Sequence, residues 1–121
     1  MSRRVLVVED QADNRRIVRD LLTRSGYEIV EVTTGEEGVT LAETQRPDLI
    51  LMDIQLPVID GYEAARRIKA NPELHHIPII AVTSYALSGD DVKAFAAGCN
   101  DYVAKPFSPR ALLAKVREYL P

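Results

Sequence analysis

Five short apolar runs, rich in β-branched residues, recur along the chain and are separated by longer segments with helical periodicity. The runs are Val5–Val8, Glu28–Thr33, Leu49–Met52, Pro78–Thr83 and Asp101–Ala104. They begin roughly 20 to 30 residues apart, which is the spacing of consecutive strand–helix units. Because the runs are apolar on both faces, they predict the strands of a parallel sheet that helices cover on each side.

The first two intervening segments carry clear helix signals. An apolar stripe marks the first of them and consists of Ile17, Val18, Leu21 and Leu22. Gly26 follows this stripe as the residue just past the helix end. The letters TGEE at residues 34–37 have the spacing of a capping box, so they open a second helix, which stops before Pro47.

Three further helices are expected in the rest of the chain. The third covers Gly61–Ala70, and the letters SGDD at residues 88–91 open the fourth. The fourth helix is expected to turn Val92, Phe95 and Ala96 inward. Ser108 and Pro109 have the residue types of an N-cap followed by a first helical residue, so they open the last helix.

This order of elements predicts an α/β fold: a doubly wound, five-stranded parallel sheet with strand order 2-1-3-4-5, a three-layer flavodoxin-like sandwich. The 121 residues show no linker or break in composition and are expected to form one domain over residues 1–121. A net charge of −3 gives no attraction to DNA or to anionic membranes. The apolar runs are too short to cross a bilayer, and the lone Cys99 fits a reducing compartment, so we expect a cytoplasmic protein.

Polar residues follow the predicted strands at positions that bring them together. Glu9 and Asp10 follow the first strand, Asp53 ends the third, Thr83 ends the fourth and Lys105 follows the fifth. Ligands of open parallel sheets bind at the carboxyl ends of the strands, where the strand order reverses. The first and third strands are neighbours in the predicted order, so the three carboxylates should share one crevice.

Three carboxylates in one crevice cannot all stay ionised without a cation. Mg2+ suits such a site, because it accepts carboxylates, a backbone carbonyl and several waters. With the metal, Lys105 and Thr83 supply the charge and the donor that stabilise a phosphoryl group in transfer, and Asp53 can accept it as an acyl phosphate. Taken singly, each residue is more often a turn, cap or surface residue than a functional one. Their coincidence at one edge favours the functional interpretation.

Four sequence stretches carry a family resemblance: VLVVED, DLILMDIQLP, AVTS and DYVAKPF, which together span nearly the whole chain. In this order they resemble the receiver domain of two-component response regulators. The sequences DLILMDIQLP and GCNDYVAKP further resemble single-domain regulators of the DivK type and the receivers of hybrid histidine kinases. The resemblance implies a phosphorylation-dependent signalling switch that works with Mg2+, and not an enzyme beyond its own phosphorylation and dephosphorylation.

The resemblance also implies roles for individual residues. Asp53 is the implied phosphoacceptor, and Lys105 and Thr83 contact the phosphoryl group. Mg2+ is bound directly by Asp10 and Asp53, by Glu9 largely through water, and by the backbone carbonyl of Gln55. The remaining implied roles are a switch aromatic at Tyr102, a cis peptide bond before Pro106, and tuning of the phosphoryl lifetime by Gln55 and Tyr85.

Partners are implied in the same way. A histidine kinase or histidine phosphotransfer protein is expected to dock on Gln11, Asn14, Ile17, Pro106 and Phe107, although the stripe position of Ile17 equally suits the core. Output is expected through protein–protein contacts at the face formed by the fourth helix, the fifth strand and the fifth helix. The protein is expected to be a monomer or a weak homodimer.

Several alternatives are weighed against this interpretation. A flavin-binding protein of the same fold needs a phosphate loop with free amides, whereas the loop here reads EDQADN. A phosphohydrolase with an aspartate nucleophile needs a second acid at position 55, which is Gln. The alternative that stays open is a phosphorylation-independent binding module. His75–His76 are interpreted as loop residues, and the pair Arg15–Arg16 as a solvated helix face.

Overall fold

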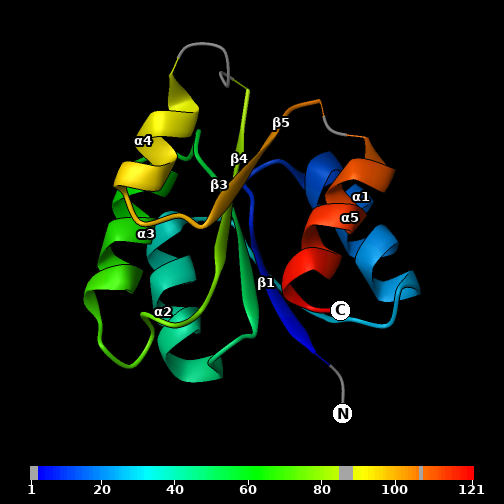
Figure 1. Ribbon diagram of the computed structural model, residues 1–121, viewed down its shortest axis with the longest axis horizontal. Helices are drawn as coiled ribbons and strands as arrows, with labels where there is room; N and C mark the ends of the chain where they lie inside the picture. The colour runs from blue at the N-terminus through cyan, green and yellow to red at the C-terminus, as the bar shows by residue number, and fades with distance from the viewer. Residues whose placement is uncertain (1–2, 85–88, 107) are drawn as a thin grey trace.

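A single parallel sheet with strand order β2-β1-β3-β4-β5 forms the centre of the computed structural model, which describes residues 3–84, 89–106 and 108–121 (Figure 1). The strands are β1 (Arg4–Val8), β2 (Glu28–Val32), β3 (Leu49–Asp53), β4 (Ile79–Thr83) and β5 (Asp101–Ala104). The helices in the described ranges are α1 (Ala12–Arg24), α2 (Gly35–Gln45), α3 (Gly61–Ala70), α4 (Asp90–Ala96) and α5 (Pro109–Tyr119). The predicted fold class and strand order are confirmed.

The sheet separates two apolar layers, because successive side chains of a strand point to opposite faces. In the central strand β3, Leu49 and Leu51 face the layer that α1 and α5 cover. Ile50 and Met52 face the layer under α2, α3 and α4 (Figure 1). All five residues of β3 are buried. A strand buried on both faces reads as a continuous apolar run, and this explains why the pattern could be recognised in the sequence.

Helix ends follow the sequence signals closely. Thr34 accepts a hydrogen bond from the backbone N–H of Glu37 at 3.1 Å, which is the predicted cap of α2. Ser108 accepts from the N–H of Ala111 at 3.4 Å and caps α5. Helix α4 begins at Asp90 after Gly89, whereas residue 88 of the SGDD signal lies outside the described residues.

The prediction that Val92, Phe95 and Ala96 face inward from α4 is wrong. The buried residues of this helix face are Ala94 and Ala97, while Val92, Phe95 and Ala96 are exposed. Two alanines three positions apart let the helix backbone approach the sheet, and the 100° step between helical residues then turns their neighbours outward.

The apolar stripe of α1 is also narrower than its sequence pattern suggested. Val18 and Leu22 are buried, but Ile17 is 46% exposed. Ile17 therefore does not belong to the core, although its stripe position suited the core equally well. It lies in the second turn of α1, close to the carboxyl edge of the sheet where that helix begins.

Gly61, the first residue of α3, lies directly behind the end of β3. A Cβ atom at Gly61 would lie 2.3 Å from the carbonyl oxygen of Asp53 and 2.8 Å from the Cα of Ile54. The N–H of Gly61 donates a hydrogen bond to the carbonyl of Ile54 at 3.0 Å. The absence of a side chain here lets α3 approach the backbone that carries Asp53.

Helix α5 runs back along the sheet and ends near the starts of the strands. The Tyr27 hydroxyl, one residue before β2, donates a hydrogen bond to the carbonyl of Leu120 at 2.6 Å. Arg4, the first residue of β1, pairs with Glu28 at the same edge. Across the described ranges, no helix is both long and apolar enough to cross a membrane.

Candidate functional site

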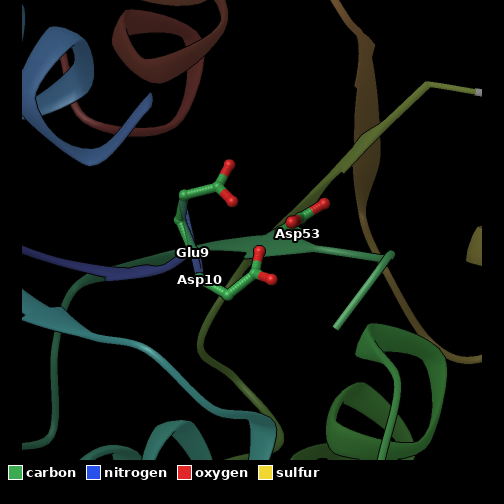
Figure 2. Close-up of side chains that lie close together, drawn as sticks. All are labelled: Glu9, Asp10 and Asp53. Atoms are coloured by element: carbon green, nitrogen blue, oxygen red, sulfur yellow. The ribbon is translucent and has the colours of Figure 1, made fainter. Parts of the chain in front are cut away.

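Three carboxylates converge at the carboxyl ends of β1 and β3, as Figure 2 shows. Glu9 and Asp10 directly follow β1, and Asp53 is the last residue of β3. These strands are neighbours, with Val8 opposite Met52, so the acids meet from two distant parts of the sequence. One oxygen of each carboxylate lies within 4.8 Å of the other two. Glu9 and Asp53 are buried, whereas Asp10 is exposed and opens the site to solvent.

Lys105 brings a positive charge to the same site from the residue after β5. Its Nζ lies 2.8 Å from Oε1 of Glu9 and 3.3 Å from Oδ1 of Asp53. The ammonium is largely buried with the two acids, so these contacts are only weakly screened by solvent. The predicted convergence of Glu9, Asp10, Asp53 and Lys105 is confirmed in its geometry.

The electrostatics of the site favour an additional cation. Burial, and then the hydrogen bond and charge of Glu9, raise the pKa of Asp53 to about 7. Burial also acts to raise the pKa of Glu9, but hydrogen bonds from Lys105, Asp53 and the Gln11 backbone hold that pKa below its usual range. The two buried acids therefore compete for the charge of Lys105, and a divalent ion relieves this competition.

Gln55 links the ends of β3 and β4 through both its backbone and its side chain. Its N–H donates to Oδ1 of Asp53 at 3.2 Å. Its side-chain Nε2 donates to Oγ1 of Thr83 at 3.4 Å, and its Oε1 accepts from the N–H of Ser84 at 3.2 Å. The sequence placed Gln55 near the phosphoacceptor, but the side-chain bridge to β4 was not foreseen.

Thr83 and Tyr102 lie on the neighbouring strands β4 and β5. The Thr83 side chain is buried, and its carbonyl accepts a hydrogen bond from the N–H of Lys105 at 2.7 Å. Tyr102 pairs in register with Ala81 and is partly buried. Its ring meets the ring of Phe95 edge-on, with centroids 6.0 Å apart. The peptide bond between Lys105 and Pro106 is cis.

An open cavity of about 530 Å³ lies beside Lys105. It is lined by Asn14, Ile17, Ser84, Lys105, Pro106 and Pro109. The structure therefore brings three of the predicted docking residues, Asn14, Ile17 and Pro106, to one surface. Gln11 is exposed nearby and accepts a hydrogen bond from the Asn14 side chain at 3.1 Å. Tyr85 and Phe107 lie outside the described residues.

Arg15 is a site neighbour that the sequence interpretation missed. The pair Arg15–Arg16 was interpreted as a solvated face, but the two side chains differ: Arg15 is 21% exposed and Arg16 is 64% exposed. Arg15 Nη1 donates a hydrogen bond to the backbone carbonyl of Glu9 at 2.9 Å. Adjacent helical residues point about 100° apart, so Arg15 can turn toward the end of β1 while Arg16 faces solvent.

The donor set of the site fits a hard divalent cation. The available ligand atoms are carboxylate oxygens, and one of the acids is open to solvent, so water could complete the coordination that Mg2+ requires. His75 and His76 are exposed and take no part in this cluster, as expected for loop residues. Glu9, Asp10 and Asp53 are thus the residues that can hold such an ion.

Comparison with known proteins gives a consistent result. The sequence pattern of the response regulator receiver domain matches residues 5–117. The polar-differentiation response regulator DivK of Brucella anthropi is 43% identical over 120 residues, covering 99% of this chain and 98% of that protein.

Solved structures agree with the sequence matches. The chemotaxis response regulator CheY4 of Vibrio cholerae superposes with a TM-score of 0.93 at 27% identity, covering 98% of this chain and 99% of that one. The receiver domain of a sensor histidine kinase from Pseudomonas aeruginosa, which has a magnesium ion coordinated in its active site cleft, gives a TM-score of 0.92 at 41% identity and covers 99% of this chain and 98% of that one. With strand order, site geometry and sequence in agreement, this chain belongs to the response regulator receiver domains of two-component signalling and is similar to DivK.

Proposed function

We propose that the protein is a phosphorylation-dependent signalling switch whose phosphoacceptor is Asp53. The observation that carries the proposal is the position of this carboxylate. It is 2% exposed at the carboxyl end of β3, and it faces Glu9, Asp10 and the Lys105 ammonium. A buried carboxylate is costly to the fold, and phosphoryl transfer supplies a functional reason for keeping it there.

The donor is a phosphohistidine on a histidine kinase or on a histidine phosphotransfer protein. A carboxylate oxygen of Asp53 attacks the phosphorus, and the new O–P bond forms as the P–N bond breaks. The imidazole leaves with the electron pair and takes up a proton from solvent. The Lys105 ammonium neutralises charge on the phosphoryl oxygens, and Thr83 donates a hydrogen bond to them. The domain acts on its own phosphoryl group only, as a receiver and not as an enzyme with a separate substrate.

Mg2+ is the proposed cofactor. The carboxylates of Glu9, Asp10 and Asp53 and the backbone carbonyl of Gln55 would hold it, with Glu9 acting largely through water. The convergence of the three carboxylates supports this assignment, as does the magnesium ion in the similar kinase receiver domain. When bound, Mg2+ neutralises part of the charge that the acids and the phosphoryl oxygens bring together.

The proposed output is a change at the surface formed by α4, β5 and α5. Thr83 lies between the carboxylates and Tyr102, and both its backbone and its side chain are hydrogen-bonded to residues of the site. A new hydrogen bond donated by Thr83 to the phosphoryl group draws its side chain toward Asp53. Tyr102, which packs against the exposed Phe95, then turns inward and alters the surface that a target protein or a second copy contacts.

Intact-mass measurement after incubation with acetyl phosphate tests the proposal, with and without MgCl2 and beside Asp53→Asn. We expect a gain of one phosphoryl group that requires Mg2+ and is absent in the variant. The same measurement with a phosphorylated histidine donor follows if acetyl phosphate does not react. Failure with both donors would contradict the proposal and would favour a phosphorylation-independent binding module.

Ile17→Asp separates donor docking from the chemistry at Asp53. Ile17 is exposed and lines the cavity beside Lys105, so a charge there costs the fold little but removes apolar contact with the donor. We expect phosphotransfer from the kinase to slow by about tenfold, which corresponds to roughly 1.4 kcal/mol of lost docking energy. Labelling by acetyl phosphate should be unchanged.

The control is Val92→Asp, which places the same charge on the exposed face of α4. It should leave transfer from the kinase unaffected. Equal transfer rates for Ile17→Asp and the unchanged protein would rule out Ile17 as a docking residue.

A further inference from the structure

We infer that Arg15 is a positioning residue for the metal site, because it holds the peptide group between Glu9 and Asp10 in the orientation that brings both acids to the site. The inference rests on the proposed function, since it concerns binding of Mg2+ by these acids. Arg15 is not itself a ligand, because it is a cation, and it contacts the backbone carbonyl of Glu9.

The contact fixes the group through which Asp10 is attached. Nη1 of Arg15 donates to the carbonyl oxygen of Glu9 at 2.9 Å. That carbonyl belongs to the peptide bond that joins Glu9 to Asp10. A planar peptide group turns as a unit, so holding its oxygen also sets the direction in which the Asp10 backbone leaves.

Besides the Lys105 ammonium on Oε1, two backbone hydrogen bonds restrain the other polar groups of Glu9. The Glu9 N–H donates to the carbonyl of Val32 in β2 at 3.1 Å. Its carboxylate Oε2 accepts from the N–H of Gln11 at 3.2 Å. The amide and the side chain of Glu9 are thus restrained by β2 and by the start of α1, and Arg15 restrains its carbonyl.

Arg15 also contacts Glu31 of β2. The Arg15 Nε lies 3.7 Å from Oε1 of Glu31, and the Arg19 Nη1 lies 3.1 Å from Oε2 of the same residue. Glu31 therefore orients the guanidinium and offsets part of its charge. The chain of contacts runs from β2 through Glu31 and Arg15 to the backbone between the two acids.

The positive charge of Arg15 could also act by repelling Mg2+. Positioning of the acids and repulsion by the charge change the Mg2+ affinity in opposite directions. If Arg15 positions the acids, its removal weakens Mg2+ binding, because the acids lose a preorganised arrangement. If its charge dominates, removal strengthens Mg2+ binding. Groups that orient metal ligands typically contribute a factor of ten or more to affinity, which exceeds the repulsion expected from a partly neutralised, solvent-accessible guanidinium.

Calorimetric titration with MgCl2 tests the inference on the unchanged protein, Arg15→Ala, Arg15→Lys and Arg16→Ala. Arg16→Ala is the matched control, because this substitution removes the same charge one residue away. The ion pair that it breaks is the exposed one between Arg16 and Asp13. We expect Arg15→Ala to weaken Mg2+ binding about tenfold. Arg15→Lys should restore most of the affinity, since an ammonium can still donate to the Glu9 carbonyl, and Arg16→Ala should bind like the unchanged protein.

A second readout reports on the peptide group directly. In metal-free protein, the amide NMR signal of Asp10 should move in Arg15→Ala and stay in place in Arg16→Ala. Glu31→Gln, which leaves Arg15 present but less firmly oriented, should weaken Mg2+ binding in the same direction and to a smaller extent. This variant and Arg15→Lys carry the test if Arg15→Ala does not fold.

The outcomes that overturn the inference are distinct from failure of the proposed function. Equal or tighter Mg2+ binding by Arg15→Ala, or equal effects of Arg15→Ala and Arg16→Ala, would overturn the role of Arg15 alone. If the unchanged protein did not bind Mg2+, the proposed function would fail together with the inference.

Discussion

Replacement of Lys105 by Met is expected to destabilise the metal-free protein by about 2 kcal/mol and to make its stability depend more steeply on Mg2+. The Lys105 Nζ contacts Glu9 at 2.8 Å and Asp53 at 3.3 Å, and both acids are buried. Without the ammonium, these carboxylates lose their buried cationic partner. Mg2+ then meets a more negative site, binds more tightly and stabilises the folded state by mass action.

Urea unfolding at neutral pH, in EDTA and over a range of MgCl2 concentrations, measures this effect. Lys115→Met is the control, because Lys115 forms an ion pair at 3.0 Å with Asp101 that is more open to solvent, and Asp101 is the first residue of β5, at the opposite end of that strand from Lys105. Its loss is expected to cost less than about 1 kcal/mol and to be independent of Mg2+. An equal loss of stability by Lys105→Met with and without Mg2+ would show that packing, and not charge, explains the effect.

Gly61→Ala is expected to lower the free energy of unfolding by about 3 kcal/mol and also to weaken Mg2+ binding. The new Cβ would lie 2.3 Å from the carbonyl oxygen of Asp53 and 2.8 Å from the Cα of Ile54. Both atoms belong to the backbone, so the strain cannot be relieved by rotation of a side chain. The end of β3 has to move, and Asp53 moves with it away from Lys105.

Gly26→Ala provides the comparison for this variant. Gly26 has a φ of 95° but no atom within 4 Å of an added Cβ, so the substitution adds conformational strain without a collision. We expect a loss of about 1 kcal/mol in urea unfolding and no change in Mg2+ affinity. If both variants lost stability equally and both bound Mg2+ normally, close approach of α3 to Asp53 would not be a determinant of the site.

The strands could be predicted because they depend on short-range signals in the sequence. The convergence of the acids could be predicted because it follows from the strand order of the sheet. A strand buried on both faces is a continuous apolar run, and parallel strands place their carboxyl ends at one edge. Once the order of β1 and β3 was inferred, Glu9 and Asp53 had to be neighbours. Neither step required knowledge of how particular side chains pack.

The features that were missed depend on packing between elements. The inward face of α4 was assigned to its largest apolar residues, whereas the sheet accepts Ala94 and Ala97 and leaves Val92 and Phe95 outside. Arg15 could not be separated from Arg16 by residue type, because the difference lies in which of them points toward the end of β1. The Gln55 bridge to Thr83 likewise joins residues that lie 28 positions apart.

The hydrogen bond from Tyr27 to Leu120 places the end of α5 beside the starts of β1 and β2. The strands end at the opposite edge of the sheet (Figure 1), and Asp53 is the last residue of β3 while Lys105 directly follows β5. A fluorescent reporter or a sensor-chip tether attached after Leu120 therefore projects away from the surface that the proposed phosphohistidine donor has to reach. Immobilised in this way, the domain can report donor binding in real time while its acidic cleft stays open to the flowing partner.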